Sequence, residues 1–146
     1  MKKLIIPMLL LAMVACKKDE TKTEDKDAAV AVTKENLVAT WSINKFEEYT
    51  LPGDSLKTSF TLTPGSGSFT LRADNSYSTV TSFGTSNGTF SLIKLNGKDV
   101  LILNEPGDRP DSNVVTKLTK SSFIISNRDF EANRNSKDYT VGHMSK

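Results

Sequence analysis

Apolar and polar side chains alternate with a period of two residues along most of the chain from residue 40 onward. In the first such segment, 40–46, Trp41 and Ile43 share one face, and in the second, Phe60 and Leu62 alternate with threonines. The same alternation recurs in seven further short segments, at 69–72, 77–80, 90–92, 100–103, 114–118, 123–125 and 139–141. The sequence therefore predicts about nine short β-strands.

Turn-forming residues separate these segments and indicate that most connections are hairpins. They occur at 51–54, 64–67, 74–75, 87–88, 96–97 and 106–108. After Val38 no stretch has an apolar period long enough for a substantial helix, which excludes a parallel sheet with helical crossovers. One short helical turn is expected at 33–38, where Thr33 offers an N-cap hydroxyl. The predicted fold class is all-β, an antiparallel barrel or sandwich.

The first fifteen residues have the pattern of a secretory signal peptide. Lys2 and Lys3 precede twelve positions, 4–15, in which Pro7 alone is not an apolar side chain. This apolar segment is shorter than the ~20 residues that a membrane-spanning helix needs. We therefore predict that residues 1–15 are a signal peptide that is removed, and that they do not anchor the protein by themselves.

The cysteine that follows this segment suggests a lipid anchor. Residues 13–16, Met-Val-Ala-Cys, resemble the lipobox of bacterial lipoproteins, although Met13 stands where Leu is usual. The resemblance implies that Cys16 is acylated with fatty acids such as palmitate and becomes the first residue of the mature protein. Several acyl chains, at ~0.8 kcal/mol per buried CH₂, would hold the chain on a membrane. The alternative is an unmodified Cys16, for which this position offers no packing reason.

A charged run follows Cys16 and bears on localisation. Nine of the eleven residues in 17–27 are charged, and the first is Lys17. The run resembles the signal that directs lipoproteins of Bacteroidota to the outer face of the outer membrane, and its alternative is a solvated spacer. We expect a lipid-anchored outer-membrane protein and leave the leaflet open. Residues 16–33 would form a tether of at most ~55–60 Å, followed by one folded domain at 34–146.

Composition narrows the classes of partner and cofactor. The chain has 19 Lys and Arg against 17 Asp and Glu, and removal of Lys2 and Lys3 with the signal peptide leaves no net charge. A neutral chain gives no support for a nucleic-acid partner. With one Cys and one His, neither an internal disulfide nor the usual soft metal-ligand sets can form, so we expect no metal and no cofactor.

Several segments together resemble the lipocalin-like domains of small Bacteroidota lipoproteins. They are a helical turn leading into 37–41, followed by 69–77, 87–92 and 114–125, so that the resemblance covers about residues 36–126. Ala39 stands where the wider lipocalin family has the Gly of its Gly-x-Trp motif. The resemblance implies an up-and-down β-barrel, lipocalin-like (calycin), with about eight or nine strands and one short N-terminal helix. It implies no chemistry.

Two features bear on the interior of such a barrel. Trp41, on the first strand, is best interpreted as a plug that buries on the order of 200 Å² at one end, with ligand stacking as the alternative. Ser and Thr number 16 each, and on the strands they alternate with apolar residues. Their hydroxyls belong on the solvent face, but any that point inward would give a half-polar lumen suited to a small amphipathic ligand.

Catalytic chemistry finds little support in the sequence. His143 is the only histidine and lies on the last strand, a poor place to hold a general base rigidly. No Gly-x-Ser-x-Gly motif is present. Glu47 and Glu48 are adjacent and point to opposite faces of a strand, so they cannot act as a pair. We predict that the protein is not an enzyme, since a small hydrolase would need His143 near a Ser or Asp in a cleft.

Two polar loops and one turn contain the remaining candidate residues for ligand binding or modification. Loop 105–113 gathers three acidic residues and Asn113, which could offer oxygen ligands to Ca²⁺ without the EF-hand spacing, or could simply be solvated. Loop 127–138 carries Arg128, Arg134 and Lys137, either as a basic rim for anionic sugars or as a solvated loop.

Residues 54–56, Asp-Ser-Leu, resemble the O-glycosylation motif of Bacteroidota, which makes Ser55 a candidate for modification.

These observations leave two hypotheses for function. In the first, a lipid-anchored cell-envelope protein holds a small hydrophobic or amphipathic molecule in its barrel. In the second, the barrel is filled by side chains, and loops such as 105–113 and 127–138 contact a protein or glycan partner. A lumen of at least ~300 Å³ favours the first hypothesis. A lumen packed with Trp41, Phe60, Phe69 and Phe90 favours the second.

Overall fold

The computed structural model describes residues 28–134 and 136–146. The predicted signal peptide, Cys16, the charged run and Asn135 lie outside the described residues. All nine predicted strands are present, and their bounds, with those of two short helices, are α1 Lys34–Leu37, β1 Ala39–Thr50, β2 Ser55–Thr61, β3 Ser68–Leu71, β4 Ser76–Thr81, β5 Gly84–Leu95, β6 Lys98–Asn104, β7 Asp111–Leu118, β8 Ser122–Ser126, α2 Arg128–Asn133 and β9 Asp138–Ser145.

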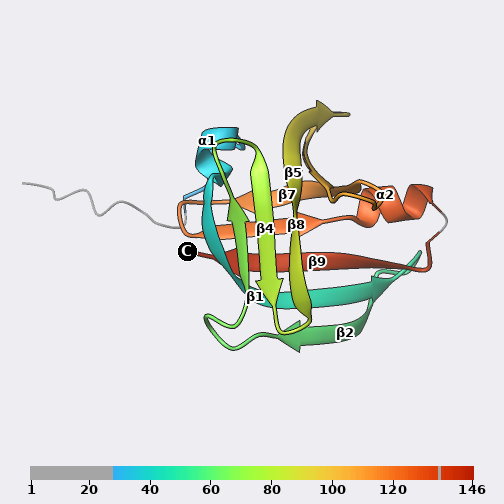
Figure 1. Ribbon diagram of the computed structural model, residues 1–146. Coiled ribbons are helices and arrows are strands. Elements are labelled where there is room, and N and C mark those ends of the chain that lie inside the picture. The colour runs from blue at the N-terminus through green and yellow to red at the C-terminus, as the bar shows by residue number, and fades with distance from the viewer. Residues whose placement is uncertain (1–27, 135) are drawn as a thin grey trace, which may run out of the picture.

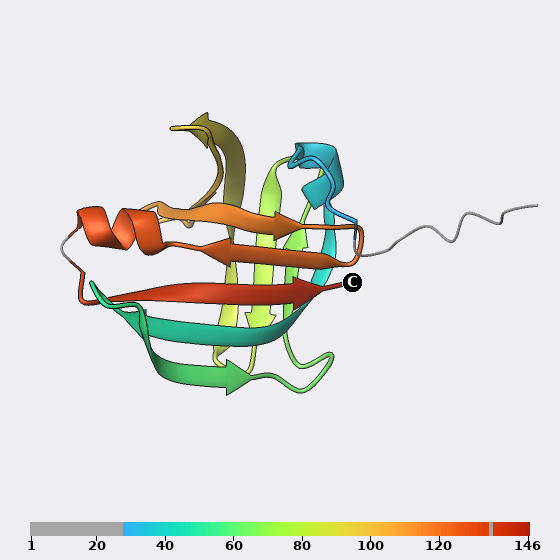
Figure 2. The same ribbon diagram turned by 180° about the vertical axis from the view of Figure 1, so that it is seen from behind.

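The strands form one antiparallel sheet that closes on itself. The sheet order is β2-β1-β3-β4-β5-β6-β7-β8-β9, and β1 also pairs with β9. Eight strands, β1 and β3 to β9, therefore make a closed up-and-down barrel, and β2 is an additional strand at an edge. In Figure 1, β4 and β5 stand upright across the front while β7, β8 and β9 run across behind them, and Figure 2 shows the same layers from the back. The predicted all-β barrel is confirmed.

One long strand, β1, pairs with three other strands. Its residues 39–42 pair with β3, and on the same edge residues 45–50 pair with β2. Its other edge pairs with β9 along residues 42–50. The barrel wall is thus interrupted where β2 takes over from the four-residue β3. Along residues 45–50 this edge of β1 therefore has β2 as its neighbour in place of a barrel strand.

The closed end is filled by a cluster of buried side chains around Trp41. The Trp41 side chain is 0% exposed, its Nε1 donates a hydrogen bond to the Leu37 carbonyl at 2.9 Å, and its ring centroid lies 5.2 Å from that of Phe123. The Lys146 ammonium lies 4.4 Å from the centroid of the Trp41 ring. The predicted role of Trp41 as a plug is confirmed. The indole also fixes α1, because it bonds the carbonyl of the last helical residue.

The predicted turn at Asn87-Gly88 is wrong. These residues lie inside β5, and the β4–β5 turn comes earlier, at residues 82–83. A glycine is required at 88 for packing: a Cβ atom there would lie 2.0 Å from the Asn104 carbonyl oxygen and 2.8 Å from Cε1 of Tyr77. Gly88 therefore permits a close approach between neighbouring strands, and the Asn-Gly pair does not mark a hairpin here.

The prediction of a loop throughout 127–138 is also wrong, because residues 128–133 form α2. The helix packs against β9 and β7. With six residues it is too short for an apolar period to reveal it. Asp129 and Glu131 in its first turn favour the helical N-terminus electrostatically. The helix lies on the outside of the barrel, so it does not alter the arrangement of side chains inside.

Candidate functional site

The inner face of the barrel encloses a cavity of about 130 Å³, further along β1 than Trp41. Its walls come from seven of the eight barrel strands, which identifies it as the part of the lumen that side chains leave unfilled. Most of the lining is apolar, and it comprises Ile43, Phe46, Phe69, Leu103, Ile125 and Met144. The cavity exists because some of the lining residues are small. Gly142 faces Phe46, where a Cβ atom would lie 3.4 Å from the ring. The other lining residues are Thr79, Thr140, Asp111 and Asn113.

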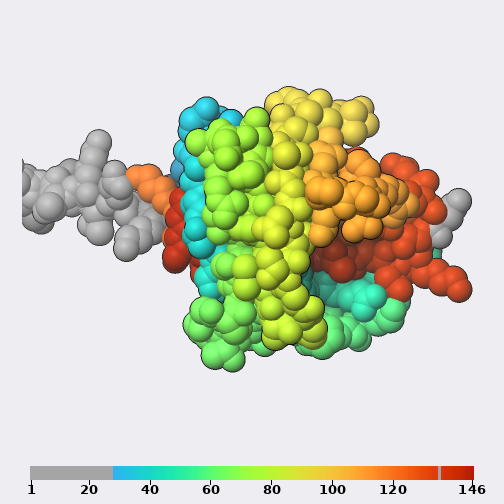
Figure 3. All heavy atoms as spheres, in the orientation of Figure 1, coloured from blue at the N-terminus to red at the C-terminus, as the bar shows by residue number. Residues whose placement is uncertain are grey.

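A second, wider hollow of about 400 Å³ adjoins this cavity at its mouth. The two share Thr79, Leu103 and Asp111 as lining residues. The remaining lining of the mouth is mainly polar and comes from β4, β5 and the segment after β6: Tyr77, Ser86, Glu105, Asp108 and Arg109. Figure 3 shows β5 in yellow beside the segment after β6 in orange, on one face of the molecule. An apolar cavity therefore opens into a polar, acidic mouth.

A chain of hydrogen bonds positions one carboxylate of the mouth. The Ser86 hydroxyl donates to Oε2 of Glu105 at 2.6 Å, and the Tyr77 hydroxyl lies 3.3 Å from the Ser86 hydroxyl. Because Ser86 gives its only proton to Glu105, Tyr77 must be the donor to Ser86. The chain joins β4 and β5 to the segment after β6. Within the described part of the protein, Oε1 of Glu105 has no hydrogen-bond partner and remains available to a ligand.

Asn113 lies at the boundary between the cavity and the mouth. Its side chain is only 4% exposed, and Nδ2 donates to Oδ2 of Asp111 at 3.0 Å. Oδ1 makes no hydrogen bond among the described residues, which nevertheless contain no fully buried side-chain nitrogen or oxygen without a partner. Oδ1 therefore keeps some accessible surface, and Asn113 is one of the residues that line the cavity. Oδ1 is a hydrogen-bond acceptor set among apolar side chains.

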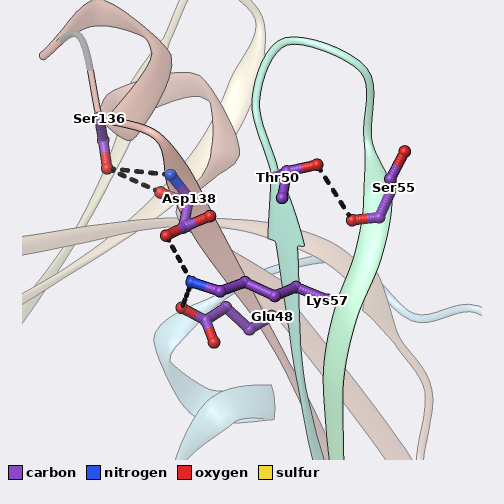
Figure 4. A network of polar contacts seen from close by, with 6 residues as sticks. All are labelled: Glu48, Thr50, Ser55, Lys57, Ser136 and Asp138. Carbon is purple, nitrogen blue, oxygen red and sulfur yellow. Dashed lines mark hydrogen bonds and ion pairs between the residues drawn. The ribbon is translucent and has the colours of Figure 1, made fainter.

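An ion-pair cluster extends the same inner face beyond the cavity. Lys57 Nζ lies 3.2 Å from Glu48 Oε1 and 2.8 Å from Asp138 Oδ2, as Figure 4 shows. Glu48 is two positions along β1 from Phe46, and Asp138 is two positions along β9 from Thr140, so both carboxylates share the face of the cavity lining. The hydrogen bonds to Asp138 and Glu48 raise the pKa of Lys57.

The candidate catalytic histidine lies elsewhere, on the outer face of the barrel. His143 Nε2 is 2.7 Å from Glu47 Oε2, and Lys45 binds the other oxygen of Glu47. The carboxylate only accepts, so Nε2 carries the proton. The Lys45 hydrogen bond is the main cause that lowers the pKa of Glu47, to about 2, and the His143 hydrogen bond also lowers it. Neither Glu47 nor His143 lines the cavity or its mouth.

Glu47 and Glu48 do point to opposite faces, as the sequence predicted. Glu47 binds Lys45 and His143 outside the barrel, whereas Glu48 binds Lys57 on the inner side. The two carboxylates form no pair. The hydrogen bond of His143 goes to a glutamate that Lys45 also binds, and it joins β9 to β1 across the strand pair.

The predicted loop 105–113 is shorter in the structure, and it lies at the mouth of the barrel. The loop ends at 110, because β7 begins at Asp111, and Asn113 belongs to that strand. Its acidic residues gather at the mouth of the barrel. In the part of the chain that the structure describes, no three His, Cys, Asp or Glu side chains converge in a group that could hold a metal ion.

The cations of 127–138 are largely neutralised by their neighbours. Arg128 donates two hydrogen bonds of 2.8 Å to the Asp54 carboxylate, and Arg134 pairs with Glu131 at 2.7 Å. The Arg128 interaction lowers the pKa of Asp54. These pairs weaken the interpretation of 127–138 as a basic rim. Ser55, beside Asp54, is exposed at the start of β2.

Comparisons with protein-family models, curated proteins and solved structures found no match to this chain. The class of protein is therefore defined by its own geometry, an eight-stranded antiparallel barrel that is filled at one end and hollow at the other. Among the described residues no helix is both long enough and apolar enough to cross a membrane. The lining residues that sequence reasoning missed are Thr79, Thr140 and Gly142, and nothing in the sequence around them indicated this role.

Proposed function

We propose that the protein is a lipid-anchored protein of the cell envelope whose lipocalin-like barrel binds a small hydrophobic or amphipathic ligand. One observation carries the ligand-binding part, namely the apolar cavity that opens directly into a wider polar mouth. An amphipathic molecule needs both environments side by side. A barrel that serves only as a scaffold needs neither.

The sizes of the two hollows favour a ligand with a small apolar part. The cavity of about 130 Å³ alone falls below the ~300 Å³ at which ligand pockets begin. The mouth, at about 400 Å³, lies above that limit. A ligand that fills both would bury a small apolar group and hold a larger polar group at the surface. Such a ligand is amphipathic rather than wholly hydrophobic.

A blocked lumen tests this function. Thr140 lines the cavity although its side chain is exposed, so Thr140→Phe should fill the hollow without disturbing the core. Thr89→Phe, at an exposed position of β5 away from both hollows, is the matched control. Full-length protein taken from its own membrane in mild detergent would be examined by native mass spectrometry. We expect a retained small molecule in the wild type and in Thr89→Phe, and none in Thr140→Phe.

Two outcomes of that experiment contradict ligand binding in the lumen. The first is a wild-type protein that carries no added non-covalent mass. The second is a molecule retained equally by Thr140→Phe, which would locate it outside the cavity. The melting temperature of each variant, measured alongside, shows whether the barrel is intact.

The anchoring part of the proposal rests on the N-terminal pattern, which includes the short apolar segment and the single Cys16. Radiolabelled palmitate fed to the native host should label the wild-type protein and leave Cys16→Ser unlabelled. The Cys16→Ser protein should also leave the membrane fraction. Failure of palmitate to label the wild type would contradict anchoring, whatever the result for ligand binding.

The alternative function is an interaction module for a protein or glycan partner. It is favoured by two aromatic side chains that the fold leaves outside, since Phe83 is 81% exposed at the β4–β5 turn and Phe60 is 54% exposed on β2. The filled end of the barrel, with Trp41, Phe69 and Phe90, also agrees with it. If the lumen holds no ligand while Phe83→Ser and Phe60→Ser abolish capture of a defined envelope protein or glycan, this function replaces the first.

Glycosylation of Ser55 is a separate proposal. Its support is the motif at 54–56 and the exposure of Ser55 at a strand start. The intact mass of the protein from its native host should exceed that of Ser55→Ala by the mass of one glycan. Equal masses, after allowance for the lost oxygen, would contradict the modification.

A further inference from the structure

We infer that the ligand of the barrel is a small cationic amphiphile, in which an ammonium group is attached to one aromatic ring or a short alkyl chain. This inference rests on the proposed ligand-binding function and adds the chemical class of the ligand. It follows from the volume of the cavity, from the charges around its mouth and from the open acceptor on Asn113.

The volume of the cavity limits the apolar part. An engineered protein cavity of about 150 Å³ lined by apolar side chains takes up one benzene molecule. The lumen cavity, at about 130 Å³ and lined mainly by apolar side chains, is of similar size. It fits a single ring or an alkyl chain of roughly four to six carbons. A long fatty acyl chain does not fit, because Trp41 and its neighbours fill the rest of the lumen.

The charges of the mouth set the polar part. Among the described residues that line the mouth, three carboxylates, from Glu105, Asp108 and Asp111, face one cation, Arg109. Glu105 is fixed by the Ser86 hydrogen bond and Asp111 by that of Asn113, and each retains one oxygen without a protein partner in the described part of the chain. Fixed carboxylate oxygens bind an ammonium group through charge-assisted hydrogen bonds.

The ion-pair cluster beyond the cavity does not offset the excess of negative charge at the mouth. Glu48 and Asp138 share Lys57, so this part of the inner face also has one negative charge in excess. In Figure 4 the Lys57 ammonium lies between the two carboxylates, so its charge is already satisfied within the cluster. An anionic ligand would meet Arg109 alone as an uncommitted cation among these lining and neighbouring described residues.

The acceptor on Asn113 places the donor of the ligand. Asn113 lines the cavity, its Oδ1 has no hydrogen-bond partner among the described residues, and its Nδ2 donates to Asp111. The Tyr77 hydroxyl is committed as a donor to Ser86. The fixed polar groups at the boundary therefore accept hydrogen bonds, and the hydroxyls of Thr79 and Thr140 can serve either role. A ligand that donates N–H bonds at this depth satisfies Oδ1, whereas a carboxylate there opposes acceptors.

The test compares three molecules that share a phenylethyl group and differ in charge. The probes are 2-phenylethylamine, 2-phenylethanol and 3-phenylpropanoate, titrated into full-length protein while the methyl signals of Ile125 and Met144 are followed by NMR. We expect the amine to bind at least tenfold more tightly than the alcohol and the acid to bind most weakly. The preference for the amine should shrink in 0.5 M salt, since it is electrostatic.

Variants assign the selectivity to the mouth. Glu105→Gln combined with Asp111→Asn should reduce the affinity for the amine to that for the alcohol, and leave the alcohol unchanged. Asp99→Asn, at the far end of β6 and outside both hollows, is the matched charge control and should leave all three affinities unchanged. The two single variants provide a second measurement should the double variant fold poorly.

The possible results separate this inference from the proposed function. If the alcohol or the acid binds as tightly as the amine, the barrel binds ligands but the inference of a cationic ligand is overturned. If the double variant keeps the full preference for the amine, the assignment to Glu105 and Asp111 is overturned. If none of the three probes shifts the Ile125 and Met144 signals, both the inference and the binding function in the lumen are contradicted.

Discussion

At the scale of single residues, Trp41 links α1 to the core of the barrel. It is fully buried, it bonds the end of α1 through Nε1, and it packs on Phe123. Trp41→Ala should lower the free energy of unfolding by about 3–5 kcal/mol, through lost burial and the cavity that is left. Urea unfolding monitored by circular dichroism measures this.

The control for Trp41 is an aromatic residue that is not buried. Phe83 is 81% exposed, so Phe83→Ala should change the free energy of unfolding by no more than about 0.5 kcal/mol. A cost for Trp41→Ala as small as that for Phe83→Ala would contradict the role of Trp41 as the plug of the closed end.

Glu47 gives the barrel a pH dependence of definite sign. Its hydrogen bond with Lys45 lowers the pKa of the carboxyl from 4.5 to about 2 in the folded protein. Because the folded pKa lies below the unfolded one, this contribution is present above pH 4.5 and is lost as the pH falls towards 2. Glu47→Gln should remove this part of the acid sensitivity, as measured by urea midpoints between pH 2 and pH 7.

The variant Lys45→Gln tests whether Lys45 is the cause of the low pKa of Glu47. Without Lys45 the main influence that lowers the pKa of Glu47 is gone, so the loss of stability should spread over a narrower range of pH just below 4.5. An acid profile for Glu47→Gln that matches the wild type would show that other carboxyls dominate, and would contradict this assignment.

The residue scale also shows what the sequence could predict. Trp41 was predictable, because a single large aromatic residue at the start of an alternating strand has few other uses. The Glu47–His143 contact was not, because it joins residues 96 positions apart and depends on the β1–β9 register. That register shifts between Ile43 and Lys45, which changes the residues that face each other. Alternation in a sequence carries no information about such a shift.

At the scale of elements, β5 depends on a glycine in its middle. A Cβ atom at Gly88 would collide with the Asn104 carbonyl at 2.0 Å, and backbone cannot move aside as a side chain can. Gly88→Ala should therefore lower the free energy of unfolding by about 1–3 kcal/mol. Chemical denaturation of the purified variant provides the measurement.

Gly53→Ala is the matched control for that substitution. Its nearest neighbour would be the Ser55 hydroxyl at 3.9 Å, an ordinary contact, so this variant should stay close to wild-type stability. If the two variants were equally stable, the close approach of β5 to its neighbours would not be a determinant of the fold.

The sequence predicted the existence of the strands better than it predicted their pairing. The alternation located all nine strands, including β2. It gave no sign that β2 lies outside the closed barrel, because pairing is decided by which edge of β1 remains free after β3 ends. The helix α2 was missed since six residues are too few to show an apolar period, and the helix packs on β9 and β7.

At the scale of the whole molecule, the barrel divides into a filled end and a hollow end. The filled end holds the buried core around Trp41, and the hollow end holds the cavity. The sequence predicted the barrel but left the state of the lumen open, because volume depends on which small residues meet across strands. Thr79, Thr140 and Gly142 come from two strands far apart in the chain, and only closure brings them together.

The hollow end is the feature on which the proposed function depends most, and xenon tests it directly. A crystal of the protein pressurised with xenon should show a xenon atom among Phe46, Ile125 and Met144, since cavities of this size lined by apolar side chains bind xenon. Thr140→Phe should lose that peak. A structure in which side chains fill this space and no xenon appears would contradict a hollow lumen, and with it ligand binding inside the barrel.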